Sequence, residues 1–419
     1  MKCNQRMAKL GAALLAFVTI TLLLASGASA QGTYKTLYKF PGDRARYVPT
    51  GGLIFDQAGN LYGTTRQGGA HGGGVVFKLA PNADGTWTES VLYDFCSLTG
   101  CTDGADSAAG LILDQSGNLY GTTYGGGNSA CTGGCGVVFE LSPSGGIWTE
   151  SVLYSFSGAD GGNPLAGLVF DQTGNLCGTT VSGGTRNGGT VFKLTPKSGG
   201  GWTESVLHSF TGGGDGYSPF GGVVFDHAGN LYGTTYEGGH GSVGTVFTLQ
   251  PGSGGTWTEK VLHHFRAGTD GSYPHDGLIL DSAGDLYGTT AAGGRYDGVV
   301  FKLTPNSGGA WTETVIHRFD VANGEGPYAG LTFDDQGNLY GTTIEGGYTT
   351  LCGNAGCGVV FKLVPNGNGG WDEKMVHKFS DHPGAGPMSG IIFDLAGNLY
   401  GTTVGDNVTT VGTVFEITP

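Results

Sequence analysis

Acidic side chains recur in loops that follow the loose pattern Gly-x-x-Asp-Gly-x-x-Pro. The recurring acids are Asp43, Asp103, Asp160, Asp215, Asp270, Glu325 and Asp381. Carboxylates that converge on one point could bind Ca²⁺ or a cationic group, because calcium prefers several oxygen ligands. A repeated Asp-Gly turn gives the same pattern without any ligand. We therefore expect no cofactor, and Ca²⁺ is the one candidate worth testing.

Aromatic side chains accompany these acids in the same loops. They are Tyr47, Tyr217, Phe220, Tyr273 and Tyr328. The apolar face of a sugar ring packs on an aromatic ring while its hydroxyls bond to carboxylates, so the combination is typical of a glycan-binding surface. The rings could instead pack beneath the loops. The residues that we predict to bind a ligand are Asp160, Asp215, Tyr217, Asp270, Tyr273, Glu325 and Tyr328.

No familiar catalytic motif is found in the sequence, and we predict no catalytic residue. The Gly-x-Ser-x-Gly elbow of esterases and the zinc-binding helix motif of metalloproteases are both absent. Polar loop residues outside the repeated pattern are His71, Arg186, His240, His275, Arg295 and His382. Single side chains of this kind are usually just solvated. Four more histidines replace a repeated tyrosine and are interpreted as packing residues: His208, His263, His317 and His377.

Cysteines form three close pairs in glycine-rich loops: Cys96 with Cys101, Cys131 with Cys135, and Cys352 with Cys357. In an exported chain such spacing predicts disulfides, although the first four cysteines could also pair between loops. A zinc site is less favoured, because no histidine lies at ligand spacing beside the pairs. Cys177 stands where other copies of the repeat have tyrosine, and we expect it to be buried and unpaired.

One block, Asp-x-x-Gly-[Asn/Asp]-Leu-[Tyr/Cys]-Gly-Thr-Thr, occurs seven times. Its aspartates are Asp56, Asp114, Asp171, Asp226, Asp281, Asp334 and Asp394, at intervals of 53 to 60 residues. Chance does not produce a ten-residue pattern seven times at near-constant spacing. Internal repetition at such a period indicates one repeat architecture rather than several unrelated domains.

Each unit is predicted to contain four short strands. In the first unit they are Leu53–Phe55, Leu61–Thr65, Gly74–Leu79 and Trp87–Phe95. The strands are separated by turns rich in Gly, Asn, Asp, Ser and Pro, and no helical period is present. Four antiparallel strands in a unit of this length are typical of a propeller blade. The loop between the second and third strands of a unit and the loop that joins one unit to the next should lie on the same face of the propeller.

The ends of the chain predict how the array closes. Tyr34–Phe40 resembles the fourth strand of a unit with nothing before it, and Gly412–Ile417 resembles a third strand with nothing after it. Pairing the two completes the seventh sheet and protects two sheet edges. We therefore predict an all-β, seven-bladed propeller at residues 31–419, in preference to an open solenoid, which would carry capping units.

The repeat resembles a known family. The run Gly-Asn-Leu-Tyr-Gly-Thr-Thr, followed by Gly-Gly and then Gly-Thr-Val-Phe-Lys-Leu-Thr-Pro, is similar to the GloVer tandem repeat of "choice-of-anchor" bacterial exported proteins. Residues 188–196 carry the second part nearly intact. The resemblance implies an exported, propeller-like repeat protein with no settled activity. Members often carry a C-terminal anchor, whereas this sequence ends at Pro419 without one, so anchoring is not expected.

The first thirty residues are predicted to be a signal peptide cleaved after Ala30. A positive start is followed by the short apolar run Leu10–Leu24 and the small residues Ala28, Ser29 and Ala30. Cleavage would remove three of the 20 basic residues and none of the 34 acidic ones, which leaves a net charge of −17. Such a charge disfavours nucleic acid and anionic lipid as partners. We expect a secreted or periplasmic monomer with no membrane span.

The leading functional expectation is a non-catalytic binding or scaffold propeller whose partner is an extracellular glycan or protein. The alternative is a secreted enzyme that acts on a polysaccharide, a lactone or an ester at the mouth of the central channel. The alternative rests on analogy of fold alone. It requires one of His71, His240 and His275 to lie within hydrogen-bond reach of a carboxylate or another base at that mouth.

Overall fold

The computed structural model describes residues 32–41, 47–294, 297–348, 350–380, 384–405 and 411–419. The chain divides into two compact units, Met1–Gln31 and Gly32–Pro419, and all described residues belong to the second. The predicted signal peptide, Asp43, Arg295, Asp381 and His382 lie outside the described residues.

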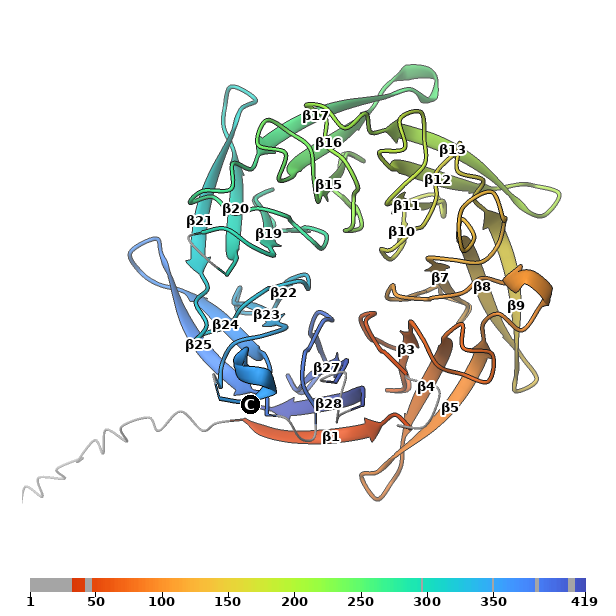
Figure 1. Ribbon diagram of the computed structural model, residues 1–419, viewed down its shortest axis with the longest axis horizontal. Coiled ribbons are helices and arrows are strands. Elements are labelled where there is room, and N and C mark those ends of the chain that lie inside the picture. The colour runs from red at the N-terminus through yellow and green to blue at the C-terminus, as the bar shows by residue number, and fades with distance from the viewer. Residues whose placement is uncertain (1–31, 42–46, 295–296, 349, 381–383, 406–410) are drawn as a thin grey trace, which may run out of the picture. The chain divides into compact units, whose positions relative to one another are not determined.

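The second unit is a seven-bladed β-propeller, as predicted (Figure 1). Each blade is a four-stranded antiparallel sheet whose strands follow the order a, b, c and d from the axis outward. The a strands are β2 (Ile54–Phe55), β6 (Ile112–Leu113), β10 (Val169–Phe170), β14 (Val224–Phe225), β18 (Ile279–Leu280), β22 (Thr332–Phe333) and β26 (Ile392–Phe393). The b strands are β3 (Leu61–Thr65), β7 (Leu119–Thr123), β11 (Leu176–Thr180), β15 (Leu231–Thr235), β19 (Leu286–Thr290), β23 (Leu339–Thr343) and β27 (Leu399–Thr403).

The c and d strands are longer and form the outer half of each blade. The c strands are β4 (Val75–Pro81), β8 (Val137–Ser144), β12 (Thr190–Pro196), β16 (Thr245–Pro251), β20 (Val299–Pro305), β24 (Val359–Pro365) and β28 (Thr413–Thr418). The d strands are β5 (Trp87–Asp94), β9 (Ile147–Ser155), β13 (Trp202–Ser209), β17 (Trp257–His264), β21 (Trp311–Arg318), β25 (Trp371–Lys378) and β1 (Thr33–Lys39). The helices of the described residues are three 3₁₀ turns, η1 (Thr99–Cys101), η2 (Ser253–Gly255) and η3 (Cys352–Asn354). None of them could span a membrane.

The ring closes through the predicted strand exchange between the two ends of the unit. β1 pairs antiparallel with β28, with Tyr34 opposite Ile417 and Tyr38 opposite Val414. The sheet β26–β27–β28–β1 is therefore the seventh blade, built from both ends of the chain (Figure 1). Closure removes the free edge that β28 would otherwise present to solvent.

The repeated motif residues hold each blade together. The Asp56 carboxylate accepts hydrogen bonds from the Ala58 and Asn60 backbone N–H groups, each at 2.9 Å, and from the Tyr62 hydroxyl at 3.0 Å. A Cβ at Gly63 would lie 2.6 Å from the Phe77 ring, so only glycine allows strands b and c to pair there. The repeated aspartate and glycine are thus explained by turn chemistry and close approach.

Phenylalanine pairs join each blade to the next. The residue after strand d packs edge-to-face on a strand c phenylalanine of the following blade, with ring centroids 5.0–5.2 Å apart. The pairs are Phe40–Phe77, Phe95–Phe139, Phe156–Phe192, Phe210–Phe247, Phe265–Phe301, Phe319–Phe361 and Phe379–Phe415. These rings are nearly inaccessible to water and form the core between blades. The same contact at all seven junctions makes the scaffold rigid.

Candidate ligand-binding site

The d–a loops and the b–c loops lie on one face of the propeller. Each d–a loop pairs with the b–c loop of the blade that follows it, as in the bridges Ala105–Gly125, Gly162–Ser182 and Tyr217–Glu237. We call this surface the loop face. The sequence analysis predicts a ligand-binding site on this face.

The disulfides are the three predicted local pairs, Cys96–Cys101, Cys131–Cys135 and Cys352–Cys357. Each disulfide lies within one loop, so none of the three links two loops. All three pairs lie in loops of the loop face. Cys177 is buried and has no disulfide partner, as expected, and burial raises the pKa of its thiol to about 12.

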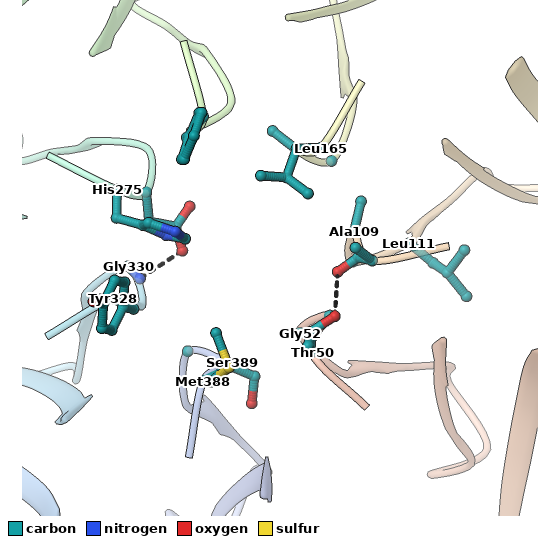
Figure 2. Close-up of a pocket in the computed structure, with 18 of the residues that line it drawn as sticks. Thr50, Gly52, Ala109, Leu111, Leu165, His275, Tyr328, Gly330, Met388 and Ser389 are labelled. Carbon is teal, nitrogen blue, oxygen red and sulfur yellow. Dashed lines mark hydrogen bonds between the residues drawn. The ribbon is translucent and has the colours of Figure 1, made fainter. Parts of the chain in front are cut away.

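A cavity of about 610 Å³ lies at the axis where the d–a loops meet the a strands (Figure 2). Each of the seven d–a loops contributes to it the residue that follows the proline position of the loop pattern. In ring order these residues are Thr50, Ala108, Leu165, Phe220, His275, Tyr328 and Met388. We call them the mouth ring. Leu165, His275 and Met388 project into the cavity from different blades in Figure 2.

Glycines and threonines fix the height of the mouth ring. Two residues after each ring member comes a glycine: Gly52, Gly110, Gly167, Gly222, Gly277, Gly330 and Gly390. Neighbouring glycines approach one another closely, since a Cβ at Gly277 would lie 3.1 Å from the Gly222 carbonyl oxygen. We call these seven glycines the glycine collar. The hydroxyl of the first threonine of Leu-Tyr-Gly-Thr-Thr hydrogen-bonds to the d–a loop that leads into the next blade. For example, the Thr122 hydroxyl donates to the Ala166 carbonyl at 3.0 Å.

One side of the cavity is an aromatic wall made by blades 4 to 6. Its members that line the cavity are Phe220, His275 and Tyr328, and Tyr236 and Tyr273 belong to it through ring packing. Phe220 stacks on Tyr236 with ring centroids 4.4 Å apart, and Tyr236 packs on Tyr273 at 5.0 Å. The His275 ring stands edge-on to Tyr328 at 4.7 Å. All five side chains are partly exposed, so the wall is accessible from the loop face.

Tyr273 holds an unfavourable backbone conformation within this wall. It has a φ of 60°, whereas the residues at the same place in five other loops, also at positive φ, are Asp106, Asn163, Ser218, Gly326 and Gly386. Asn, Asp and Gly tolerate the left-handed region far better than a bulky aromatic does. The cost is offset by contacts of Tyr273, which packs on Tyr236 and on a buried cluster that includes Val243 and Phe265.

His275 and Asp276 form the most polar part of this side. The Asp276 carboxylate accepts backbone N–H groups from Gly277 and Gly330, each at 2.6 Å, which ties blade 5 to blade 6 (Figure 2). Burial lowers the pKa of His275, and the adjacent Asp276 carboxylate only partly opposes this shift. His275 is therefore neutral at pH 7. Its uncharged ring can donate one hydrogen bond to a ligand or accept one from it.

The other side of the cavity carries Arg66 and Tyr124. Both follow the second threonine of a b strand, and both line the cavity. The Arg66 guanidinium lies 5.6 Å from the centroid of the Tyr124 ring. Burial raises the pKa of Asp106, the nearest acid, while the charge of Arg66 opposes that shift. The cavity thus has an aromatic side and a cationic side.

Most of the recurring acids lie away from the cavity, at the outer junctions between blades. Each is held by a tyrosine or histidine of the preceding d strand: Tyr93 with Asp103 (3.0 Å), Tyr154 with Asp160 (2.5 Å), His208 with Asp215 (3.5 Å) and His263 with Asp270 (3.3 Å). The histidines are therefore packing residues of the outer strands, as interpreted from the sequence. Burial lowers the pKa of both His208 and His263.

Glu325 differs from the other acids, because its backbone pairs with Glu345 on the loop face. Burial raises its pKa, and the carboxylates of Asp297 and Glu345 add to the shift. The acid beside the blade 5 histidine, His317, is instead Asp320. Of the seven residues predicted to bind a ligand, Tyr328 lines the cavity, and Tyr273 packs on Tyr236.

The remaining predicted residues are separated. A Cβ at Gly212 would lie 3.2 Å from the Tyr217 ring, so this ring packs on its own loop. His71 and Arg186 are exposed, and His240 stacks on His264 at 3.8 Å. In the described part of the chain, neither His71, His240 nor His275 forms an ion pair with a carboxylate. Within the same residues no three His, Cys, Asp or Glu side chains are grouped to hold a metal.

Sequence reasoning missed several cavity residues, notably Arg66, Asp276 and Met388. A signal for them exists, because the seven d–a loops can be aligned on the later glycine and on the proline that six of them carry, with Ser107 in its place in the other. In that alignment the position after proline holds a different residue in every blade. The positions that line the cavity differ between blades, so a search for repeated residues does not find them.

Comparisons with known proteins agree with this architecture. The model of the Gloeobacter/Verrucomicrobia repeat matches residues 26–224, 128–352 and 198–415, which together span most of the chain. A search of curated proteins finds no match.

Two solved structures are similar in fold at low sequence identity. A protein from Lactobacillus plantarum is 14% identical, with a TM-score of 0.53, over 83% of this chain and 89% of that chain. A fungal alcohol oxidase of the AA5 family, solved in complex with copper, is 15% identical, with a TM-score of 0.55, over 93% of this chain and 76% of that chain. At these identities the likeness shows the fold alone.

Proposed function

The chain belongs to the Gloeobacter/Verrucomicrobia repeat family, and from this premise we propose that it is a non-catalytic binding propeller of the cell exterior. Its partner is a glycan, and the glycan end enters the cavity at the mouth ring. The three disulfides support a location outside the cytoplasm, where such bonds persist.

The mouth ring carries the proposal. The chain repeats its turn aspartate, its strand glycine and its threonines seven times, yet the seven mouth-ring residues all differ. A purely structural ring would repeat one small residue there, as the glycine collar does two positions later. Seven different side chains around one cavity are what recognition of an asymmetric small ligand requires.

The chemistry of the wall favours a sugar over an extended protein segment. Phe220 lines the cavity and is partly exposed, and Tyr328 and His275 add polar tips beside it. Aromatic faces pack on the apolar face of a sugar ring, and the polar tips and Asp276 can bond to its hydroxyls. A cavity of about 610 Å³ is within the range that small ligands occupy.

The catalytic alternative has less support. None of the three loop histidines is paired with a carboxylate in the described residues. Proton transfer in such an enzyme needs a base within hydrogen-bond reach of a second polar group. No observation on the cavity favours a particular reaction.

Thermal melting with a glycan panel tests the proposal, because a ligand that binds only the folded state raises the melting temperature. Gly52 lines the cavity, and a Cβ there meets no atom within 4 Å, so Gly52→Phe should fill the cavity without strain. Gly199 is equally open but lies in a c–d turn, which makes Gly199→Phe the matched control. A stabilising glycan should act on the control and not on Gly52→Phe.

Two results would contradict the proposal. The first is a panel in which no glycan stabilises the natural protein. The second is a glycan that stabilises Gly52→Phe fully. In the second case an Asp215→Ala, Tyr217→Ala double variant decides whether the outer junctions bind instead, since both residues lie away from the cavity.

A further inference from the structure

Arg66 is an unusual residue for its place in the repeat. It follows β3, and the residues at the same place in the other blades are Tyr124, Val181, Tyr236, Ala291, Ile344 and Val404. It is the one charged member of that set. Among the described residues that line the cavity, only Arg66 and His275 can carry positive charge, and burial keeps His275 neutral.

The guanidinium of Arg66 lacks a partner of opposite charge. Its Nε is buried and has no hydrogen-bond acceptor, and no carboxylate of the described residues lies within ion-pair distance of it. It lies over the face of Tyr124, and its charge also acts on the Asp106 carboxylate, which is not within ion-pair distance. A half-buried guanidinium without an acceptor costs free energy, so a bound anion would satisfy it.

We infer that the mouth of the cavity recognises a uronic acid, either free or at the end of an oligosaccharide. The Arg66 guanidinium takes the carboxylate of the sugar, and the aromatic wall packs on the face of its ring. This inference rests on the proposed function and narrows it to acidic sugars. Arginine suits the role because its planar fork matches a carboxylate in a bidentate arrangement.

The strongly acidic composition of the protein limits the ligand to an end group. Its formal net charge of −14 repels a polyanionic chain that lies along the surface. A single carboxylate inside the cavity is affected mainly by near neighbours, because salt screens charges beyond about 8 Å at physiological ionic strength. The neighbouring acids are Asp106, whose pKa is raised by burial, and Asp276 on the opposite side of the cavity, which already accepts two backbone N–H groups.

The test measures binding of glucuronate and galacturonate to the full mature chain by titration calorimetry. Glucose and galactose are the neutral counterparts, and benzoate is a ring carboxylate without hydroxyls. Arg66→Gln removes the charge at the cavity, and Arg186→Gln removes the same charge from an exposed place on the loop face. Circular dichroism and the melting temperature confirm that both variants fold.

Uronates should bind the natural protein and Arg186→Gln equally, and Arg66→Gln should lose about tenfold or more in affinity, as loss of a charge-assisted hydrogen bond implies. Neutral sugars that bind as tightly as uronates, or uronate binding that survives in Arg66→Gln, would overturn the inference while the proposed function stands. Equal binding of benzoate would overturn the sugar assignment. Absence of any binding, with no glycan effect on melting either, would overturn both.

Discussion

Replacing Glu150 and Glu204 by glutamine should stabilise the propeller at alkaline pH and leave it unchanged at acid pH. Each glutamate lies in a d strand against an aspartate from the loop of the preceding blade, Asp103 for Glu150 and Asp160 for Glu204. One carboxylate oxygen of each glutamate is buried without a hydrogen-bond partner. Burial, and then repulsion by the aspartate, raises the pKa of both glutamates to about 7.

The direction of the effect follows from linkage. The unfolded chain has an ordinary glutamate pKa of 4.5, so the folded protein binds the proton more tightly. This contribution to stability is fully present below pH 4.5 and is lost as the pH rises through about 7. At pH 8 the folded protein therefore carries two costly carboxylates, and glutamine removes that cost.

The magnitude can be worked from the same shift. A displacement of about 2.5 pKa units corresponds to roughly 3.4 kcal/mol per glutamate at most. Both side chains are partly exposed to water, so screening reduces this to about 1 kcal/mol each. A domain of this length unfolds with an entropy of about 0.8 kcal/mol/K, so the double variant should gain roughly 2–3 °C in Tm at pH 8.

These two junctions are chosen because their third member is a tyrosine. The Tyr93 hydroxyl contacts Asp103 and the Tyr154 hydroxyl contacts Asp160, and burial raises the pKa of both phenols further above the neutral range. The later junctions hold histidines, as in the contact of His208 with Asp215. Burial lowers the pKa of such a histidine, which destabilises the fold as the pH falls and would mask the glutamate effect.

Calorimetric melting at pH 4 and pH 8 is the appropriate assay. Glu237→Gln is the control, because Glu237 is exposed on the loop face and lies at no outer junction. Equal stabilisation at both pH values would mean that the glutamine amides simply pack better, and the electrostatic reasoning would be wrong. A lower Tm at pH 8 would refute it more directly, since it would show that the ionised glutamates support the fold.

Three further outcomes are expected in thermal melting. Cys177→Tyr should stabilise by about 1–2 kcal/mol, because it extends toward a cavity of about 210 Å³ beside Asp171, where other blades have a tyrosine; a lower Tm would mean that the cavity cannot accept the ring. Thr122→Val should cost about 1–3 kcal/mol, since it leaves the buried Ala166 carbonyl without its donor, and an unchanged Tm would deny the link between blades. Phe40→Ala should cost about 3–5 kcal/mol, because Phe40 is 2% exposed and locks the closing blade; a loss typical of a surface site would contradict that role.

The fold could be predicted because its determinants are local and repeated. The turn aspartate, the glycine opposite the strand c phenylalanine, and the pair of threonines each act within one blade or between neighbours. Seven copies of one solution made the blade count and the strand order readable. The closing strand could be predicted because β1 and β28 each lack the partner that every other unit provides.

The site could be predicted only in part, because radial position in a propeller is a tertiary property. Asp160 and Tyr328 occupy similar loops in the sequence, yet the Asp160 carboxylate lies at an outer junction and the Tyr328 side chain lines the cavity at the axis. Contacts between glutamate and aspartate of adjacent blades join residues far apart along the chain, and the repeat pattern does not predict these contacts. Glu325 shows a further difficulty, since loops of unequal length shift which acid reaches a junction.

Residues that depart from the repeat because they bind a ligand can be distinguished from residues that depart from it without a function. At the mouth of the cavity two departures carry a cost: the charge of Asp276 among small residues, and the buried Nε of Arg66 without an acceptor. Both residues line the same cavity. Cys177 also departs from the pattern, but it leaves an unfilled space between two blades and brings no polar group to it. A symmetric scaffold can select an asymmetric ligand only where its copies differ, and costly differences that share one cavity are best explained by the ligand they serve.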